Sequence, residues 1–311
     1  MRHVLLSLVL VATLLLVVTG LNGCAGNSSP AKPTVVSTIF ANYDIVRAVG
    51  GPYVHNVILL PPRTSPHDYT PTRNDKREVQ EASLIIKNGL HLDDWVDPMR
   101  ATNQKAKVLT IATAIDVKPL QTAELQPDEA AGGGAAAAHV HGPGNPHIWL
   151  DPMNQIAATR VITEQLVALD PAHAADFRAN AEKYIAQLTA LDQQFREVTS
   201  HFTQKDFIGF HSAYDYLAHR YGLRQIASLE EVEEAGMTPA QAREVIDLIR
   251  KYHIKAIFVE TAMPSKDADM IVRETGVKKL VLQPLETYDS LSDTYVGLME
   301  QNLKNLKEAL E

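Results

Sequence analysis

Four side chains that can bind a metal ion stand beside predicted strand ends or a predicted helix start. They are His67 in PPRTSPHDYTPT, His147 in NPHIWLDP, His211 in DFIGFHSAYDYL and Glu286 in LVLQPLET. Histidine is the commonest metal ligand, and three imidazoles with one carboxylate form a nitrogen-rich site that suits Zn²⁺. Calcium and magnesium prefer oxygen ligands, and manganese accepts more carboxylate than this set offers. The residue types therefore favour zinc.

Glu286 decides between two kinds of zinc site. Four protein ligands close a zinc tetrahedron, whereas a catalytic zinc usually keeps one position for water. A mononuclear zinc hydrolase, with Glu286 or Glu260 as general base on a bound water, is therefore the alternative to a binding protein. The chain has no nucleophile elbow, phosphate loop or H-E-x-x-H helix, which favours binding.

Three further acids could accept a hydrogen bond from the ring N–H of a metal-binding histidine. They are Glu260 in IFVETAMPS, Asp68 and Asp215. Asp68 and Asp215 could equally be solvated surface acids, and Glu260 could simply begin a helix. The four proposed ligands are far apart in the sequence and form no local motif, so only the fold can bring them together.

Short apolar, β-rich runs alternate with helical stretches along the chain. Near-continuous apolar strands of this kind predict parallel sheets covered by helices on both faces, which is an α/β fold. In such sheets ligands bind beyond the carboxyl ends of the strands, where three of the four candidates fall. His147 follows no obvious strand. The predicted strands are Thr34–Ile39, Tyr53–Leu60, Leu84–Asn88, Val108–Ala112, Phe207–Phe210, Gln225–Ser228, Ala256–Val259 and Lys279–Leu282.

Helix signals divide the chain into two lobes. Asp151-Pro152 and Thr238-Pro239 each place a capping residue before a proline at the first helical position. Apolar residues from Asp176 to Val198 recur every three or four positions and predict one long amphipathic helix. We therefore expect an N-terminal α/β lobe over 34–170, a connecting helix over 171–200 and a C-terminal α/β lobe over 201–311, with the metal in the cleft between the lobes.

The N-terminus is expected to be a lipoprotein signal peptide over residues 1–23. A charged start and the apolar run 4–18 lead to Leu-Asn-Gly-Cys, which resembles the lipobox of bacterial lipoproteins. Cys24, the only cysteine, would carry the lipid that anchors the chain in the bilayer, and residues 24–33 would form a tether. Removing Arg2 would leave 28 basic and 37 acidic residues, which argues against a nucleic-acid partner.

A segment rich in Ala, Gly and Pro interrupts the predicted N-terminal lobe. Residues 122–146 read TAELQPDEAAGGGAAAAHVHGPGNP, which predicts a flexible surface loop. His139 and His141 lie inside it. They could form a weak auxiliary metal site, but linker histidines are the simpler interpretation.

Several segments resemble those of the metal-binding lipoproteins that serve zinc and manganese ABC importers. The resemblance is carried by PHDYTPT, NPHIWLDP and GFHSAYDYLAHRYGL, by NGLHLDDWV (88–96) and by TYVGLMEQNLKNL (294–306). It implies two α/β lobes joined by one rigid helix, with His67, His147 and His211 as the imidazole ligands of an ion between them. Three histidines resemble the zinc branch, since manganese-type members commonly replace the third with a carboxylate.

The fourth ligand departs from one common pattern of that family. Many relatives carry an Asp in a segment like L-D-P-L-G, whereas residues 282–286 here read LQPLE, with Gln283 at the position of the Asp. Other zinc-binding relatives carry P-L-E, and this resemblance implies Glu286 as the ligand. Water or a different acid remains the alternative.

The resemblance implies a binding protein and not an enzyme. It would lie on the extracytoplasmic face of the cell membrane, bind Zn²⁺ and deliver the ion to the membrane permease of an ABC importer. We expect a monomer. A Mn²⁺- or iron-binding member of the same importer class is the nearest alternative, and a zinc hydrolase is a more distant one. Nothing in the sequence specifically supports a surface adhesin.

Overall fold

The computed structural model describes residues 32–120, 144–229, 237–261 and 266–311. The predicted signal peptide, Cys24, nearly all of the tether, and His139 and His141 lie outside the described residues. No helix within the described ranges is long and apolar enough to cross a membrane.

Two parallel four-stranded sheets organise the chain, as the α/β pattern predicts. The first has the order β2-β1-β3-β4 and the second the order β6-β5-β7-β8. All eight predicted strands are present, each shifted by no more than a few residues. Their bounds are β1 Thr34–Ser37, β2 His55–Ile58, β3 Leu84–Lys87, β4 Lys107–Thr110, β5 Asp206–Gly209, β6 Arg224–Ser228, β7 Ala256–Val259 and β8 Lys278–Val281.

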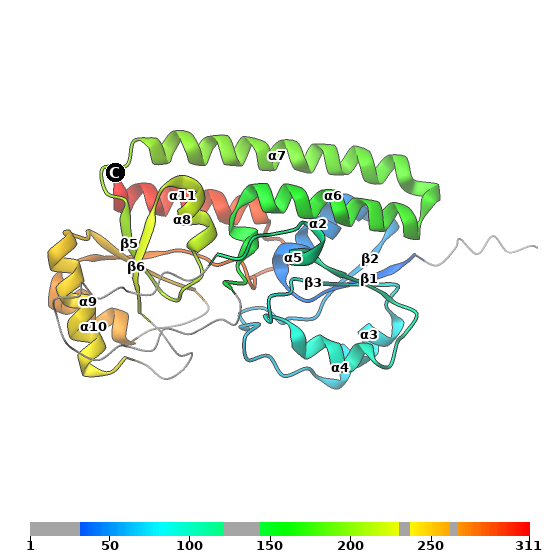
Figure 1. Cartoon of the computed structure of the whole chain (residues 1–311), viewed down its shortest axis with the longest axis horizontal. Helices are drawn as coiled ribbons and strands as arrows, with labels where there is room; N and C mark the ends of the chain where they lie inside the picture. Colours follow the sequence, from blue (N-terminus) through cyan, green and yellow to red (C-terminus); the bar gives the residue numbers. More distant parts are fainter. Residues whose placement is uncertain (1–31, 121–143, 230–236, 262–265) are drawn as a thin grey trace, which may run out of the picture. The chain divides into compact units, whose positions relative to one another are not determined.

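Helices flank both sheets (Figure 1). The predicted caps are present, because Asp151 accepts a hydrogen bond from the backbone N–H of Met153 and Thr238 forms a capping box with Gln241. The helix bounds are α2 Phe40–Gly50, α3 Arg73–Glu81, α4 Asp97–Arg100, α5 Ile111–Ala114, α6 Pro152–Leu169, α7 Ala174–Ser200, α8 Asp215–Tyr221, α9 Pro239–Tyr252, α10 Lys266–Thr275 and α11 Tyr295–Leu310.

Each sheet has apolar residues on both faces. Neighbouring residues of a strand point to opposite sides of the sheet, so consecutive apolar residues line both of its faces. Val35 and Val36 of β1 belong to two different hydrophobic clusters, and so do Phe207 and Ile208 of β5. One cluster packs the first sheet against α3 and α4, and another packs the second sheet against α9 and α10. The largest cluster contains residues of both sheets together with α2, α6, α7, α8 and α11. Both sheets therefore share one core beside the long helix.

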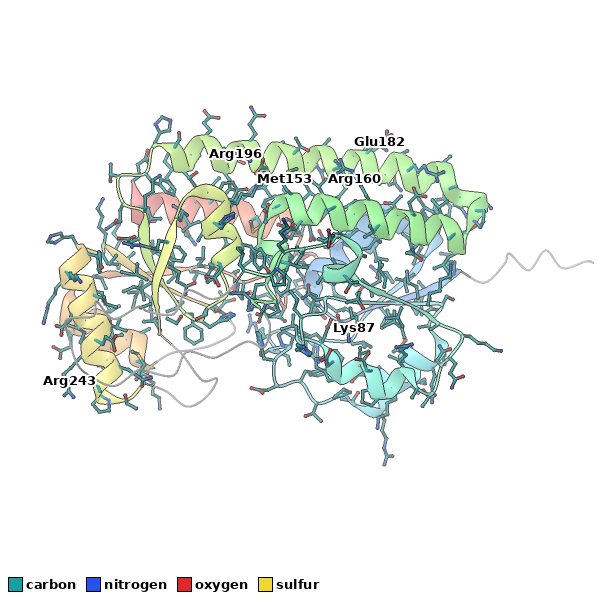
Figure 2. All side chains as sticks on the ribbon, viewed as in Figure 1. Lys87, Met153, Arg160, Glu182, Arg196 and Arg243 are labelled. Atoms are coloured by element: carbon teal, nitrogen blue, oxygen red, sulfur yellow. The ribbon has the colours of Figure 1, made fainter. Side chains whose placement is uncertain are left out.

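The long helix α7 has 27 residues, which corresponds to about 40 Å. It contacts α2 and α6 on one side of the chain and α8 and α11 on the other (Figure 1). Its apolar residues, including Phe177, Leu188 and Phe195, are buried, whereas Glu182 and Arg196 lie on its exposed side (Figure 2). The predicted amphipathic helix is confirmed.

A buried carboxylate on α7 ties together the helices that follow two of the proposed ligands. Asp192 accepts hydrogen bonds from Arg196, from Arg220 of α8 at 2.7 Å and from the hydroxyl of Tyr221 at 3.0 Å. Arg220 also contacts Asp151, the N-cap of α6, at 3.0 Å. The network therefore joins the start of α6, which follows His147, and the end of α8, which follows His211, to the long helix.

Replacing Asp192 by asparagine should lower the free energy of unfolding by about 2 kcal/mol, because it leaves the Arg220 guanidinium without its charged partner on α7. Urea unfolding of the metal-free protein measures this. Arg196→Gln is the matched control, since Arg196 is 57% exposed and its ion pair with Asp192 should contribute less than about 1 kcal/mol. Equal losses of unfolding free energy in the two variants would show that the buried Asp192–Arg220 contact stabilises the fold no more than the exposed Asp192–Arg196 pair does.

Candidate metal centre

His67 lies in the loop that follows β2. Its backbone N–H donates to the Ser65 hydroxyl at 3.2 Å, and the preceding carbonyl, of Pro66, accepts from the indole of Trp95 at 3.0 Å. The imidazole is 19% exposed. These contacts fix the loop directly before His67, and the His67 ring keeps an edge toward solvent.

His147 is fully buried just before the 3₁₀ turn Ile148–Leu150 that leads into α6. Its Nδ1 lies 2.6 Å from Oδ1 of Asn145. Two residues later the indole of Trp149 donates to the carbonyl of Pro284 at 2.7 Å. His147 therefore has a rigid setting although no strand precedes it.

His211 follows β5 by two residues, at the carboxyl edge of the second sheet. Its Nδ1 lies 2.6 Å from Oε1 of Glu260, which directly follows β7, and its backbone carbonyl accepts from Gln225 at 2.8 Å. Strands β5 and β7 are neighbours and lie on either side of the point where the strand order reverses. This is where α/β sheets usually bind their ligands.

Glu286 is presented by a segment after β8 whose backbone is held in place by side chains. Leu285 has the left-handed φ of 58°, an uncommon conformation for a non-glycine residue that turns the chain before Glu286. The carbonyl of Glu286 accepts from the N–H of Phe40 at the start of α2 at 3.1 Å. Other carbonyls of the segment accept from buried side chains, namely Leu282 from Tyr214, Gln283 from Asn302 and Pro284 from Trp149.

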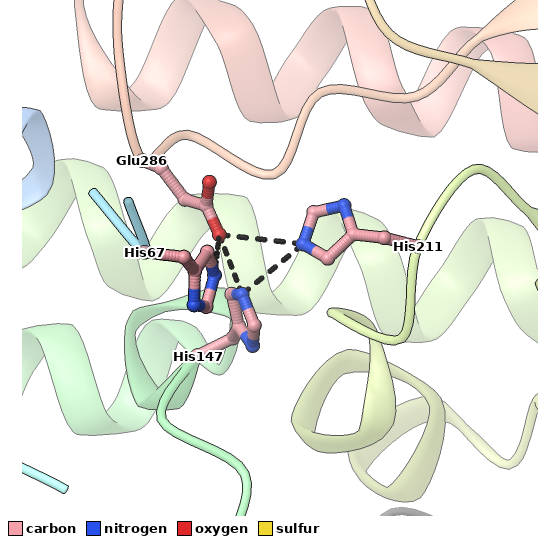
Figure 3. A group of neighbouring side chains, drawn as sticks. All are labelled: His67, His147, His211 and Glu286. Carbon is pink, nitrogen blue, oxygen red and sulfur yellow. Dashed lines mark hydrogen bonds and ion pairs between the residues drawn. The ribbon is translucent and has the colours of Figure 1, made fainter. Parts of the chain in front are cut away.

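These four side chains meet at one point. Figure 3 shows the Glu286 carboxylate facing all three imidazoles. Oε1 lies 3.2 Å from Nε2 of His67, 2.5 Å from Nε2 of His147 and 3.3 Å from Nε2 of His211, and the last two nitrogens are 3.2 Å apart. In a zinc tetrahedron with bonds of about 2.0–2.1 Å the ligand atoms lie roughly 3.3 Å apart. Three of these four separations match that spacing.

The electrostatics of the cluster favour a cation. Burial lowers the pKa of His147 to about 3, so this ring is neutral at physiological pH. Burial by itself would raise the pKa of Glu286, but His67 and His211 outweigh it and hold that pKa well below its usual range. A buried neutral imidazole and a buried anionic carboxylate are the forms that a divalent metal requires.

The structure distinguishes among the other residues singled out from the sequence. Glu260 contacts His211, as a partner of a metal-bound imidazole should. Asp215 contacts Asn145 at 2.7 Å, and Asn145 in turn contacts His147. Asp68 is exposed, and none of the described hydrogen bonds joins it to an imidazole. The side chain of Gln283 bonds to Thr261 and does not belong to the cluster.

Asn145 was not singled out from the sequence and falls in the predicted flexible surface loop 122–146. That prediction is wrong for its end, because Asn145 is fully buried and contacts a proposed ligand directly, whereas residues 122–143 lie outside the described residues. The available signal was its position two residues before His147, because Asn side chains often bond to backbone groups two residues ahead. Asn145 belongs to no strand, so the rule that ligands bind beyond the carboxyl ends of parallel strands could not indicate it.

Two parallel four-stranded sheets that share one long helix, with four converging side chains that could hold a metal ion, are the arrangement expected of a metal-binding solute-binding protein. The chain belongs to the family of zinc-uptake complex component A, periplasmic, whose model matches residues 35–309.

Individual relatives agree with this membership. The zinc-binding lipoprotein AdcA of Streptococcus pneumoniae is 30% identical over 284 residues, which cover 90% of this chain and 56% of AdcA. The high-affinity zinc uptake system protein ZnuA of Bacillus subtilis is 28% identical over 296 residues, covering 92% of this chain and 90% of ZnuA. The crystal structure of the Zn(II)-bound ZnuA-like domain of S. pneumoniae AdcA superposes with a TM-score of 0.74 at 28% identity, over 90% of this chain and 99% of the domain. The chain thus spans about half the length of AdcA and nearly all of ZnuA.

Proposed function

We propose that this protein binds Zn²⁺ as cargo through His67, His147, His211 and Glu286, and delivers it to the membrane permease of an ABC importer. The observation that carries the proposal is the convergence of four ligand atoms within 4.8 Å of one another. The two named relatives are a zinc-binding lipoprotein and a zinc uptake protein, which supports the same cargo.

Binding is favoured over hydrolysis by the role of Glu286. Its Oε1 contacts all three Nε2 atoms, so it lies where the fourth ligand of a tetrahedron would lie and not one water molecule away from it. Glu260, the other candidate base, already contacts His211. We therefore propose that the protein is not an enzyme.

Zinc is favoured over manganese and iron by the donor set. Three imidazoles and one carboxylate suit zinc, whereas manganese prefers more oxygen ligands and octahedral geometry. A manganese- or iron-binding member of the same importer class remains the second candidate.

The anchor and location extend the proposal beyond the described residues. We propose that Cys24 carries a lipid and that residues 24–33 tether the fold to the outer face of the cell membrane, as a monomer whose two lobes are residues 34–170 and 201–311 joined by residues 171–200. The relative AdcA is named a lipoprotein, and the lipobox-like sequence supports the same arrangement.

Zinc affinity should fall as the pH is lowered. Burial by itself would lower the pKa of His211, but Glu260 and Glu286 outweigh it and raise that pKa well above its usual range. His211 therefore holds a proton at neutral pH in the metal-free protein, and zinc must displace it, so affinity rises with pH. The dissociation constant should change by about tenfold per pH unit for each displaced proton. Chelator competition between about pH 8 and about pH 5 measures this, and an affinity that does not change over that range would contradict histidine ligation.

Elemental analysis of protein purified without chelator, followed by competition between zinc and manganese, tests the proposed cargo. We expect one zinc per chain and a preference for zinc over manganese of at least about a hundredfold. Preferential retention of manganese or iron would support the second candidate. Zinc retained together with hydrolysis of simple ester or peptide substrates would support the hydrolase instead.

A further inference from the structure

The fully buried Asn145 uses both ends of its side-chain amide. Its Oδ1 lies 2.9 Å from the backbone nitrogen of His147 and 2.6 Å from Nδ1 of the same residue. Its Nδ2 donates to the carbonyl of Ser212 at 2.8 Å and to Oδ2 of Asp215 at 2.7 Å. The amide thus connects one proposed ligand with the segment that directly follows another, His211.

The surroundings determine which end of the amide is oxygen. The backbone N–H of His147 can only donate, so the atom facing it must be the acceptor Oδ1. At the other end, the carbonyl of Ser212 can only accept, so the atom facing it must be the donor Nδ2. These two contacts agree independently, and a flipped amide would violate both.

The orientation of the amide fixes the proton on the His147 ring. Because Oδ1 accepts, Nδ1 of His147 must carry the hydrogen of that 2.6 Å contact. In the neutral ring this leaves Nε2 with a free electron pair, directed toward Glu286 at 2.5 Å. A bound metal ion would accept an electron pair from each of these two atoms.

The same amide sets the relative position of two ligands. The hydroxyl of Tyr216 also donates to the carbonyl of Asn145 at 3.0 Å, so three contacts join Asn145 to residues 212–216. The Nε2 atoms of His147 and His211 are 3.2 Å apart, close to a tetrahedral edge of roughly 3.3 Å. Displacing Asn145 would disturb this spacing and the ring proton together.

We propose that Asn145 is a positioning residue that holds His147 with Nδ1 protonated and Nε2 unprotonated, as binding of the ion through Nε2 requires, and that joins His147 to the segment carrying His211. This rests on the proposed function, because the role concerns a ligand of the proposed zinc site. Glu260 makes the corresponding contact to Nδ1 of His211, with a carboxyl group in place of an amide. An amide suits the His147 position better, since a carboxylate there would face Asp215 in a buried setting.

The test compares Asn145→Ala and the isosteric Asn145→Asp with wild type, by zinc–chelator competition and by NMR of protein with isotope-labelled histidine. In the zinc-loaded wild type we expect His147 to bind through Nε2 and to show a slowly exchanging Nδ1–H. Asn145→Ala should lower zinc affinity by about 10–100-fold and make that Nδ1–H exchange quickly. Asn145→Asp keeps an acceptor for Nδ1 but loses the donor to Ser212, so it should retain the protected N–H with reduced affinity.

Asn154→Ala is the matched control. Asn154 donates to the carbonyl of Ile148 at 2.9 Å, beside the same turn, but its side chain makes no described contact with an imidazole. Its zinc affinity and its His147 signal should match those of the wild type.

Wild-type affinity and an unchanged Nδ1–H signal in Asn145→Ala would overturn the positioning role while leaving zinc binding intact. If Asn145→Ala does not fold, the wild-type spectrum still decides, because metal bound through Nδ1 of His147 would overturn the role. Failure of the proposed function would look different, since the wild type itself would then bind no zinc.

Discussion

Replacing His147 by alanine should weaken zinc binding by roughly two to three orders of magnitude. Tetrahedral zinc sites contribute about 10–16 kcal/mol in total, so one of four ligands accounts for about 2.5–4 kcal/mol. His147 is fully buried and contacts Glu286, and it belongs to the only group of metal-ligand side chains found among the described residues. No other described imidazole can therefore replace it. Chelator competition at neutral pH measures the loss.

His219→Ala is the control for this prediction. His219 lies on the exposed side of α8, eight residues after His211, so its loss removes an imidazole without touching the cluster. It should bind zinc like the wild type. A His147→Ala protein that remains folded and keeps wild-type affinity would show that the ion binds elsewhere.

Replacing Glu286 by glutamine should lower zinc affinity by at least about a hundredfold and open the fourth position to water. The substitution preserves size but removes the anion that faces all three imidazoles. The variant should still bind zinc weakly through three nitrogens. Competition with a weak chelator gives the affinity, and a cobalt-substituted sample reports the change in coordination through its visible spectrum.

The control for the carboxylate is Glu182→Gln, a substitution on the exposed side of α7 (Figure 2). It changes the net charge by the same amount without changing the site. If Glu286→Gln and Glu182→Gln both bind zinc like the wild type, water or another acid completes the coordination and Glu286 is not a ligand.

The central strands β1, β3, β5 and β7 were predictable because they are short apolar runs buried on both faces, and β-branched residues such as Val35 and Ile85 favour strands in that setting. The helix starts were predictable for a local reason, since Asp151 and Thr238 satisfy the first free N–H groups of their helices. Both signals act over a few residues, which is the range that sequence patterns describe.

The candidate site was only partly predictable. The carboxyl-end rule indicated His211, but it gives no distances and does not apply to His147, whose position depends on Asn145 and on a turn without a strand. Asp68 and Asp215 looked equivalent in the sequence, yet one is exposed and the other contacts Asn145. Such differences arise from contacts between segments that are far apart in the chain.

The position of Glu286 could likewise be predicted only in part from the sequence. Whether Gln283 or Glu286 reaches the cluster depends on the left-handed turn at Leu285 and on the hydrogen bond to Phe40. Neither feature can be recognised in the sequence. Leu rarely adopts the left-handed conformation, so a Leu at this position does not indicate such a turn. The carboxyl-end rule indicated Glu286 as a candidate beforehand, but only the resemblance to relatives with P-L-E favoured it over the position of Gln283.

A crystal structure of the zinc-loaded protein, with the ion located from anomalous scattering at the zinc absorption edge, tests the central claim most directly. We expect a single strong peak about 2.0–2.2 Å from Nε2 of His67, His147 and His211 and from an oxygen of Glu286. A peak bound by other residues, or no ordered zinc at this cluster in a saturated crystal, would contradict it.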